Sequence, residues 1–123
     1  MRFTIIMSSI LFSFTALANC KVFIPEKEFN YYGYVINFDF TEMLSKKNYK
    51  EVYSAEDSDL FLSLEGIEFE GPRFHRAKAV LALGDYKVEE SVLCLTQFCG
   101  LSDYGKAFSK SYRKLAEMIP YCQ

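Results

Sequence analysis

Two runs of alternating apolar residues on either side of Gly71-Pro72 constrain the fold of this chain more than any other feature. The apolar positions are Leu60, Leu62 and Leu64 in the first run and Ala77, Ala79, Leu81 and Leu83 in the second. Alternation with a period of two is typical of a strand with one buried face, and Gly-Pro is a strong turn signal. The pattern therefore predicts an antiparallel hairpin whose leucines face a core.

Charges on the same two runs predict the register of this hairpin. The pairs in the expected register are Leu60–Leu83, Leu62–Leu81, Leu64–Ala79, Glu65–Lys78, Phe69–Phe74 and Glu70–Arg73. In this register apolar residues lie opposite apolar residues and acidic residues lie opposite basic ones. A shift by one residue would turn the leucines to the other face. An even-length turn at Gly84-Asp85 continues the alternation through Val88 and Val92 to Cys94. We expect a three-stranded meander over residues 60–95.

The segment from Phe29 to Lys47 has the apolar spacing of a helix face. Its apolar residues recur every three or four positions, which is the spacing of an amphipathic helix. Gly33 and the density of aromatic residues leave open a start near Asn37. Asn48 follows two lysines and suits a helix C-terminus, because Asn tolerates the left-handed conformation. We expect a helix at about 37–47.

The last part of the chain also has the spacing of an amphipathic helix. The pattern covers residues 103–119, follows Ser102 or Asp103 as the N-cap, and stops before Pro120. Serine and aspartate are favoured N-cap residues, and proline is common just after a helix ends. We therefore expect a second helix at about 103–119.

Two short β-prone segments complete the expected architecture. Lys21–Pro25 is closed by proline and suits an edge strand, and Tyr49–Tyr53 suits another short strand. The expected fold is α+β: a two-layer sandwich in which a mainly antiparallel sheet of about 4–5 strands packs against two helices. The meander at 60–95 forms most of this sheet.

The N-terminus reads as a secretory signal peptide over residues 1–18. Arg2 precedes the apolar stretch Ile5–Phe14, and Ala16-Leu17-Ala18 provides small residues at the expected cleavage positions. Removing these 18 residues from 123 leaves a single mature domain over residues 19–123, which is within the ordinary size range of one domain. No later segment is apolar enough to predict a transmembrane helix.

The four cysteines all follow the expected cleavage point. An even number in an exported domain favours disulfides, and of three possible connectivities we expect Cys94–Cys99 and Cys20–Cys122. The first pair is close in sequence, and the second joins residues beside both mature termini, which often lie close together. The alternative is a lipoprotein anchored through Cys20, but Asn19 stands where a lipobox has a small residue. The expected location is therefore periplasmic or secreted.

The order of elements resembles small α/β modules of the Gram-negative envelope, of the type of the TolB N-terminal domain. The resemblance is carried by the run Met43–Val52, in which a tyrosine leads the strand, by Asp59-Leu60 at the start of the meander, and by the closing helix before Pro120. It covers most of the mature chain. It implies an interaction or assembly module and assigns no catalytic residue.

Motifs for chemistry are absent from the sequence. Without Arg2 the chain has 13 basic and 16 acidic residues, and a nucleic-acid binder needs a concentrated basic stripe. His75 is the single histidine, and the expected register places it opposite Glu68 on an exposed hairpin, where a surface ion pair is the ordinary interpretation. A structural zinc site usually has two close C-x₂₋₄-C pairs, whereas here only Cys94-x₄-Cys99 is close. We expect no catalytic residues, no metal and no cofactor.

Tyrosine is the residue type that most favours an interface here, because its ring packs while its hydroxyl stays hydrated. The residues that we expect to contact a partner are Tyr31, Tyr32, Tyr34, Glu68, Arg73 and His75. The leading hypothesis is an exported interaction or assembly module without catalytic activity, whose partner is another envelope protein. The alternative is a secreted inhibitor or immunity-type protein that blocks a partner enzyme through the exposed hairpin. A small hydrolase has the least support.

Overall fold

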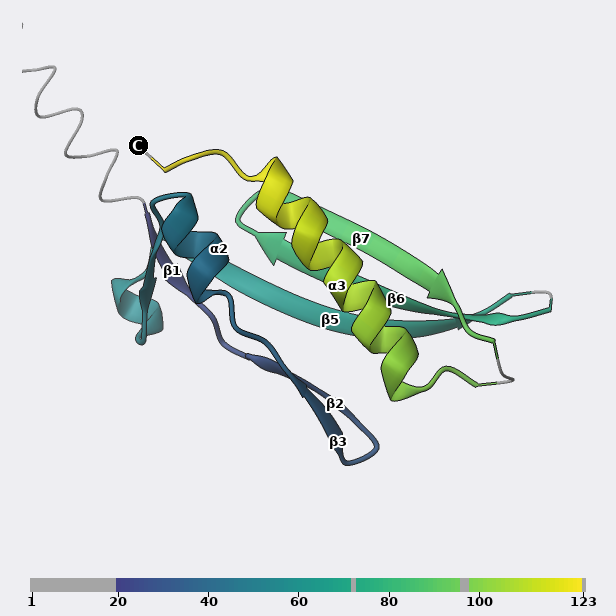
Figure 1. Ribbon diagram of the computed structural model, residues 1–123. Coiled ribbons are helices and arrows are strands. Elements are labelled where there is room, and N and C mark those ends of the chain that lie inside the picture. The colour runs from purple at the N-terminus through teal and green to yellow at the C-terminus, as the bar shows by residue number, and fades with distance from the viewer. Residues whose placement is uncertain (1–19, 72, 96–97, 123) are drawn as a thin grey trace, which may run out of the picture.

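A mixed five-stranded sheet forms one layer of the structure (Figure 1). The computed structural model describes residues 20–71, 73–95 and 98–122, so the expected signal peptide and its cleavage site lie outside the described residues. The strand order is β4-β1-β5-β6-β7. The strands are β1 (Lys21–Phe23), β4 (Lys50–Val52), β5 (Leu60–Glu70), β6 (His75–Leu83) and β7 (Tyr86–Leu93). With the helices packed against this sheet, the α+β fold and the predicted meander β5-β6-β7 are confirmed.

The prediction that Lys21–Pro25 is an edge strand is wrong. β1 pairs in parallel with both β4 and β5 and lies between them. The Cys20 carbonyl accepts a backbone hydrogen bond from Lys50, and Val22 is fully buried. Pro25 does not interfere, because it follows the last paired residue, Phe23, and so no ladder hydrogen bond needs its missing N–H.

The buried face of the meander is as predicted, but its register differs by two residues. Leu62 lies opposite Leu83, and Leu64 lies opposite Leu81. The turn holds four residues, 71–74, and is closed by a hydrogen bond of 3.0 Å from the Gly71 N–H to the Phe74 carbonyl. A shift of two residues leaves every side chain on its predicted face, so the leucine core survives. At Gly84-Asp85 the two-residue connection is confirmed, with Leu83 opposite Tyr86.

The segment from Phe29 to Asn37, whose apolar spacing also fits a helix face, is a hairpin, and the helix expected at about 37–47 begins later. Strands β2 (Glu28–Tyr31) and β3 (Tyr34–Asn37) pair with each other in a separate two-stranded sheet, and the helix α2 covers only Thr41–Lys46. Tyr32 and Gly33 have φ angles of 49° and 88°, which a tight turn can use and a helix cannot. Asn48, with φ of 67°, has the left-handed conformation that we predicted after this helix.

The long helix α3 (Leu101–Met118) packs across β6 and β7. It begins earlier than predicted, because Gly100 is the N-cap and Asp103 accepts a hydrogen bond of 2.8 Å from the Gly100 N–H. On its buried side, the Ser111 hydroxyl donates a hydrogen bond of 2.7 Å to the Ala79 carbonyl of β6. The core between the layers includes Leu62, Leu81, Leu83, Phe40, Leu44, Phe108 and Leu115. No helix in the described ranges is long and apolar enough to cross a membrane.

The connection between β4 and β5 contains a short 3₁₀ turn, η1 (Ala55–Asp57). It occupies the segment that the sequence marks as a polar loop. Its side chains Glu56 and Asp57 are exposed, and the turn is held by local contacts such as the bond from the Ser58 hydroxyl to the Ala55 carbonyl at 2.7 Å. This segment therefore connects two strands and adds nothing to the core.

Candidate interaction site

Both predicted disulfides are present. Cys20 and Cys122 join the start of β1 to the segment after α3, with their Cα atoms 5.8 Å apart. Cys94 and Cys99 close the connection between β7 and α3, with their Cα atoms 5.2 Å apart. The two bridges lie at opposite ends of the structure (Figure 1). We call the end with Cys20 and Cys122 the near end and the other the distal end.

The distal end brings together segments that are far apart in the sequence. It comprises Tyr31 and Tyr32 from the β2–β3 hairpin, residues 68–71 and 73–76 around the β5–β6 turn, and residues 93–95 and 98–99 of the disulfide loop. Cys94 and Cys99 are themselves buried. The disulfide therefore anchors the loop to the core, while Leu95 and Phe98 of this loop are exposed.

Glu68 links the β5–β6 hairpin to the disulfide loop. One carboxylate oxygen, Oε1, accepts a hydrogen bond of 3.3 Å from the Cys99 backbone N–H, and the other, Oε2, lies 3.2 Å from His75 Nδ1. The predicted contact between Glu68 and His75 exists, although it is diagonal: the residue opposite His75 is Glu70. The ring of Phe98 lies 5.9 Å from the His75 ring. This set of contacts holds the shape of the distal end.

The tyrosine cluster divides into one structural residue and two exposed ones. The Tyr31 hydroxyl donates to the Cys99 carbonyl, and its ring lies 5.2 Å from that of Tyr104 on α3. Tyr32 packs edge-on against Tyr31 at 4.7 Å between ring centroids, yet remains 85% exposed. Tyr34 is exposed beyond the turn. Tyr31 therefore attaches the β2–β3 hairpin to the disulfide loop, and Tyr32 and Tyr34 remain accessible.

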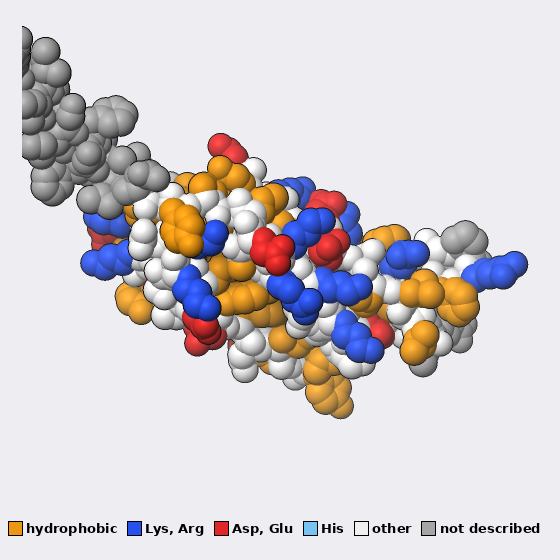
Figure 2. All heavy atoms as spheres, turned by 45° about the horizontal axis from the view of Figure 1, so that its top comes forward, with side chains coloured by type: hydrophobic (Ala, Val, Ile, Leu, Met, Phe, Trp, Pro, Cys, Tyr) orange, Lys and Arg blue, Asp and Glu red, His pale blue; other side chains and the backbone are white. Residues whose placement is uncertain are grey.

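Exposed apolar side chains are the main feature of the distal end that the sequence reasoning missed. They are Phe69, Phe74, Leu93, Leu95 and Phe98, of which Leu95 is 82% and Phe98 64% exposed. Figure 2 shows hydrophobic side chains gathered at the narrow end of the molecule, beside basic side chains. A signal was available for two of them, because Phe69 and Leu93 alternate with the residues of the predicted core face. Arg73 is exposed in the adjacent turn.

Burial raises the pKa of two tyrosines that support this end. The pKa of Tyr104 is raised to about 12, chiefly by burial and next by the Glu68 carboxylate. Burial and the Glu68 carboxylate also raise the pKa of Tyr31. Both hydroxyls are therefore neutral and poorly suited to act as bases at neutral pH. The described residues hold no group of three or more His, Cys, Asp or Glu side chains placed to bind a metal.

The outer face of α3 carries a second exposed cluster, and it is basic. It consists of Lys106, Lys110, Arg113 and Lys114. Lys114 is 3.7 Å from Glu90 of β7, so part of this charge is balanced within the molecule. A basic face on an amphipathic helix is usually hydrated, and we take the cluster as such a face.

No family model, curated protein or solved structure matches this chain. The resemblance to envelope modules of the TolB N-terminal type therefore stays a prediction.

Proposed function

We propose that this domain is an exported, non-catalytic interaction module that binds another protein through its distal end. The observation that carries the proposal is the cluster of exposed apolar side chains, including Phe74, Leu95 and Phe98, around a disulfide-closed loop. Contiguous exposed apolar side chains with polar neighbours are typical of protein-binding surfaces. Aromatic anchors contribute much of the binding energy at such surfaces.

Rigidity is the second argument for a binding surface here. The disulfide, the Glu68 hydrogen bond to Cys99 and the Tyr31 hydrogen bond to Cys99 all hold the loop from different elements. A surface that is ordered before binding loses less conformational entropy when a partner binds. The two disulfides also fit an oxidising compartment, and we propose the periplasm as the location, with an envelope protein as the partner.

The proposal is tested by comparing matched surface variants of the exported protein in a pull-down from an envelope extract. The distal variant carries Phe74→Ser, Leu95→Ser and Phe98→Ser. The control carries Tyr53→Ser and Tyr121→Ser, whose rings are 83% and 59% exposed away from the distal end. We expect a partner that the wild type and the control enrich and that the distal variant loses while melting normally. Equal enrichment by all three would contradict the proposal.

An inhibitor of a partner enzyme is the second candidate. It is favoured by the way the ends of β5 and β6 at the distal end project past the start of α3 (Figure 1), because a projecting segment that is already ordered loses little entropy on entering an active-site cleft. The partner recovered above decides between the two functions. A partner whose hydrolytic activity falls on adding the domain supports inhibition, and a partner without such activity supports assembly.

A further inference from the structure

A groove of about 520 Å³ lies between α3 and β7. Its lining includes Val92 of β7 and, on α3, Gly105, Lys106, Ser109, Lys110 and Arg113. β7 is the last strand of its sheet, so no further strand of that sheet closes the groove on its outer side. Figure 2 shows Lys and Arg side chains gathered over the middle of the molecule. The groove therefore combines open access with three of the four residues of the basic cluster on α3.

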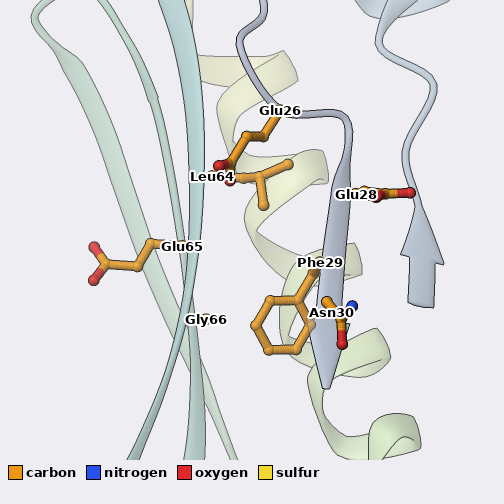
Figure 3. A pocket seen from close by; sticks show the side chains of 7 residues that line it. All are labelled: Glu26, Glu28, Phe29, Asn30, Leu64, Glu65 and Gly66. Carbon is orange, nitrogen blue, oxygen red and sulfur yellow. The ribbon is translucent and has the colours of Figure 1, made fainter. Parts of the chain in front are cut away.

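Gly105 lies within α3 and has no packing role among the described residues. Glycine disfavours a helix relative to alanine, and a glycine inside a helix usually has a packing or functional reason. At Gly66 of β5 the reason is packing, because the Phe29 ring lies over it and a Cβ atom there would overlap that ring (Figure 3). Beyond its own helix backbone and chain neighbours, a Cβ atom at Gly105 would meet nothing within 4 Å. Its missing side chain therefore leaves open space in the groove.

The basic side chains of the groove repel one another along α3. Lys106 and Lys110 are four residues apart, and Lys110 and Arg113 are three apart. Residues at these spacings are neighbours on a helix surface, where like charges are destabilising. In the part of the chain that the structure describes, none of these three cations forms an ion pair. Their repulsion in the free domain is therefore screened only by water and dissolved ions.

Two choices that disfavour a helix thus coincide in one groove. Local preferences mostly agree with the fold, and departures from them are expected at functional sites. Acidic residues outnumber basic ones by 16 to 13 over residues 19–123, so this concentration of cations does not follow from composition. An anionic ligand would offset the repulsion, and the space over Gly105 would admit it.

The shape and surroundings of the groove favour a protein segment over a membrane surface. Its cations border a recess that Val92 and Gly105 help to line, and a flat bilayer cannot enter a recess. Two carboxylates, Glu90 and Glu117, adjoin the basic cluster and would repel an anionic membrane. No lining residue is an exposed large apolar side chain, the kind that anchors membrane-surface helices.

We infer that this groove binds an acidic segment of a partner protein, with Asp or Glu at alternate positions of an extended chain. Lys106 and Arg113 are about 10 Å apart along the helix axis. Alternate side chains of an extended chain recur about every 6–7 Å, so two or three carboxylates of one short segment can reach the three cations. The basic cluster is hydrated in the free domain, and binding exchanges that water for carboxylates. The site is separate from the distal end and does not depend on the function proposed for it.

The test uses the exported protein, labelled with ¹⁵N, and a blocked hexapeptide that alternates Glu and Ser. We expect saturable shifts of the backbone amides of Gly105 and Ser109, and none of comparable size at residues 68–71. Two further peptides alternate Gln with Ser and Lys with Ser. Neither should bind, because the first is neutral and the second has the wrong charge. Added salt should weaken binding of the Glu-Ser peptide, because it screens exposed charges.

Matched variants locate the charge effect. The groove variant carries Lys106→Gln, Lys110→Gln and Arg113→Gln. The control, which loses the same charge from exposed positions on other elements, carries Lys21→Gln, Lys50→Gln and Arg73→Gln. The groove variant should bind the peptide about tenfold more weakly and melt no lower than the wild type, because it loses the repulsion along α3. The control should keep its affinity within about twofold.

Gly105→Leu distinguishes a shaped groove from a diffuse positive surface. Leucine favours a helix more than glycine does, and the space over residue 105 is open, so the variant should melt no lower than the wild type. The added side chain would fill the recess without changing the charge. Saturable binding of the Glu-Ser peptide should therefore be lost.

Four results would overturn the inference. They are no saturable binding of the Glu-Ser peptide by the wild type, equal binding of the Gln-Ser peptide, and wild-type affinity in the Gly105→Leu variant. The fourth is binding of phosphatidylglycerol vesicles without binding of the peptide, which would assign the basic cluster to a lipid surface.

Discussion

The near and distal ends of this molecule are each closed by a disulfide, yet they differ in what surrounds the bridge. At the near end, Cys20 is followed by buried Val22 and Ile24, and Ile119 before Cys122 is 1% exposed. At the distal end the cysteines are buried, but Leu95 and Phe98 between them face solvent. The first bridge lies within the frame of the fold, and the second supports a surface. The residues around the near-end bridge stabilise the domain, whereas we propose that those around the distal bridge bind its partner.

Loss of the near-end disulfide should have the largest effect on stability. The bridge spans 102 residues of sequence, and closing a loop of that length removes about 4–5 kcal/mol of chain entropy from the unfolded state. Cys20→Ala with Cys122→Ala should therefore lower the free energy of unfolding by about that amount. Urea unfolding monitored by circular dichroism measures it. A loss below about 1 kcal/mol would show that the near end is not the part that stabilises the domain.

Core truncation comes next. Leu81 is fully buried opposite Leu64 and under α3, so Leu81→Ala should cost about 2–5 kcal/mol through lost burial and a cavity. Leu95→Ala is the matched control, because Leu95 is 82% exposed, and it should change stability by less than about 0.5 kcal/mol. Thermal melting of the two variants measures this difference. Equal falls in their melting temperatures would contradict it.

The distal disulfide should contribute less. Its cysteines are five residues apart in sequence, and the same entropy relation gives about 2 kcal/mol for so short a loop. Cys94→Ala with Cys99→Ala should therefore unfold at a higher urea concentration than the near-end double variant. Partner binding should suffer more than stability does, because the exposed side chains would lose their support. A variant that bound its partner normally would contradict the role given to this loop.

Alkaline pH should weaken the support of the distal end. Because the folded pKa of Tyr104 is about 12 and its ordinary value is 10.0, the neutral hydroxyl is favoured in the folded state. The resulting stability is present in full below pH 10 and is lost as the pH rises towards 12. Unfolding followed from pH 8 to 12 should show this fall, and Tyr104→Phe should flatten it. Identical pH profiles for the two proteins would contradict the assignment.

The smallest stability effects should come from the polar pair at the distal end. Glu68 accepts a backbone hydrogen bond from Cys99, so Glu68→Ala should cost about 1 kcal/mol. His75→Ala removes a partly exposed contact and should cost less than about 0.5 kcal/mol. Neither substitution should abolish hydrolysis of an envelope substrate such as peptidoglycan, because we propose no catalytic activity for this domain. A hydrolytic activity that His75→Ala eliminated without lowering the melting temperature would replace the interaction module with an enzyme.

Local patterns predicted the parts of the fold that depend on neighbouring residues. The leucine face of the meander, the turn at Gly84-Asp85 and the conformation of Asn48 all follow from side-chain alternation or backbone preference. The register of the β5–β6 hairpin did not, because two loop lengths differing by two residues place the same side chains on the same faces.

The β2–β3 hairpin and the candidate site depended on tertiary contacts that no local pattern contains. Phe29 and Ile36 fit a helix face by spacing, but they lie opposite each other in the hairpin. The sequence did indicate Tyr31, Tyr32, Glu68 and His75 as interaction residues, and the structure brings these four together around Cys99. The alternation of the meander also placed Phe69 and Leu93 on the exposed face, but it could not place them beside Leu95 and Phe98, because that depends on tertiary contacts.

Site-specific photo-crosslinking tests the central claim most directly. A benzophenone amino acid would replace Phe98 at the distal end, or Tyr53, which is 83% exposed outside it, in cells that export the protein. The account predicts a discrete cross-linked adduct with another protein from position 98 and none from position 53. Adducts of equal yield from both positions, adducts from position 53 alone, or none from either would contradict it.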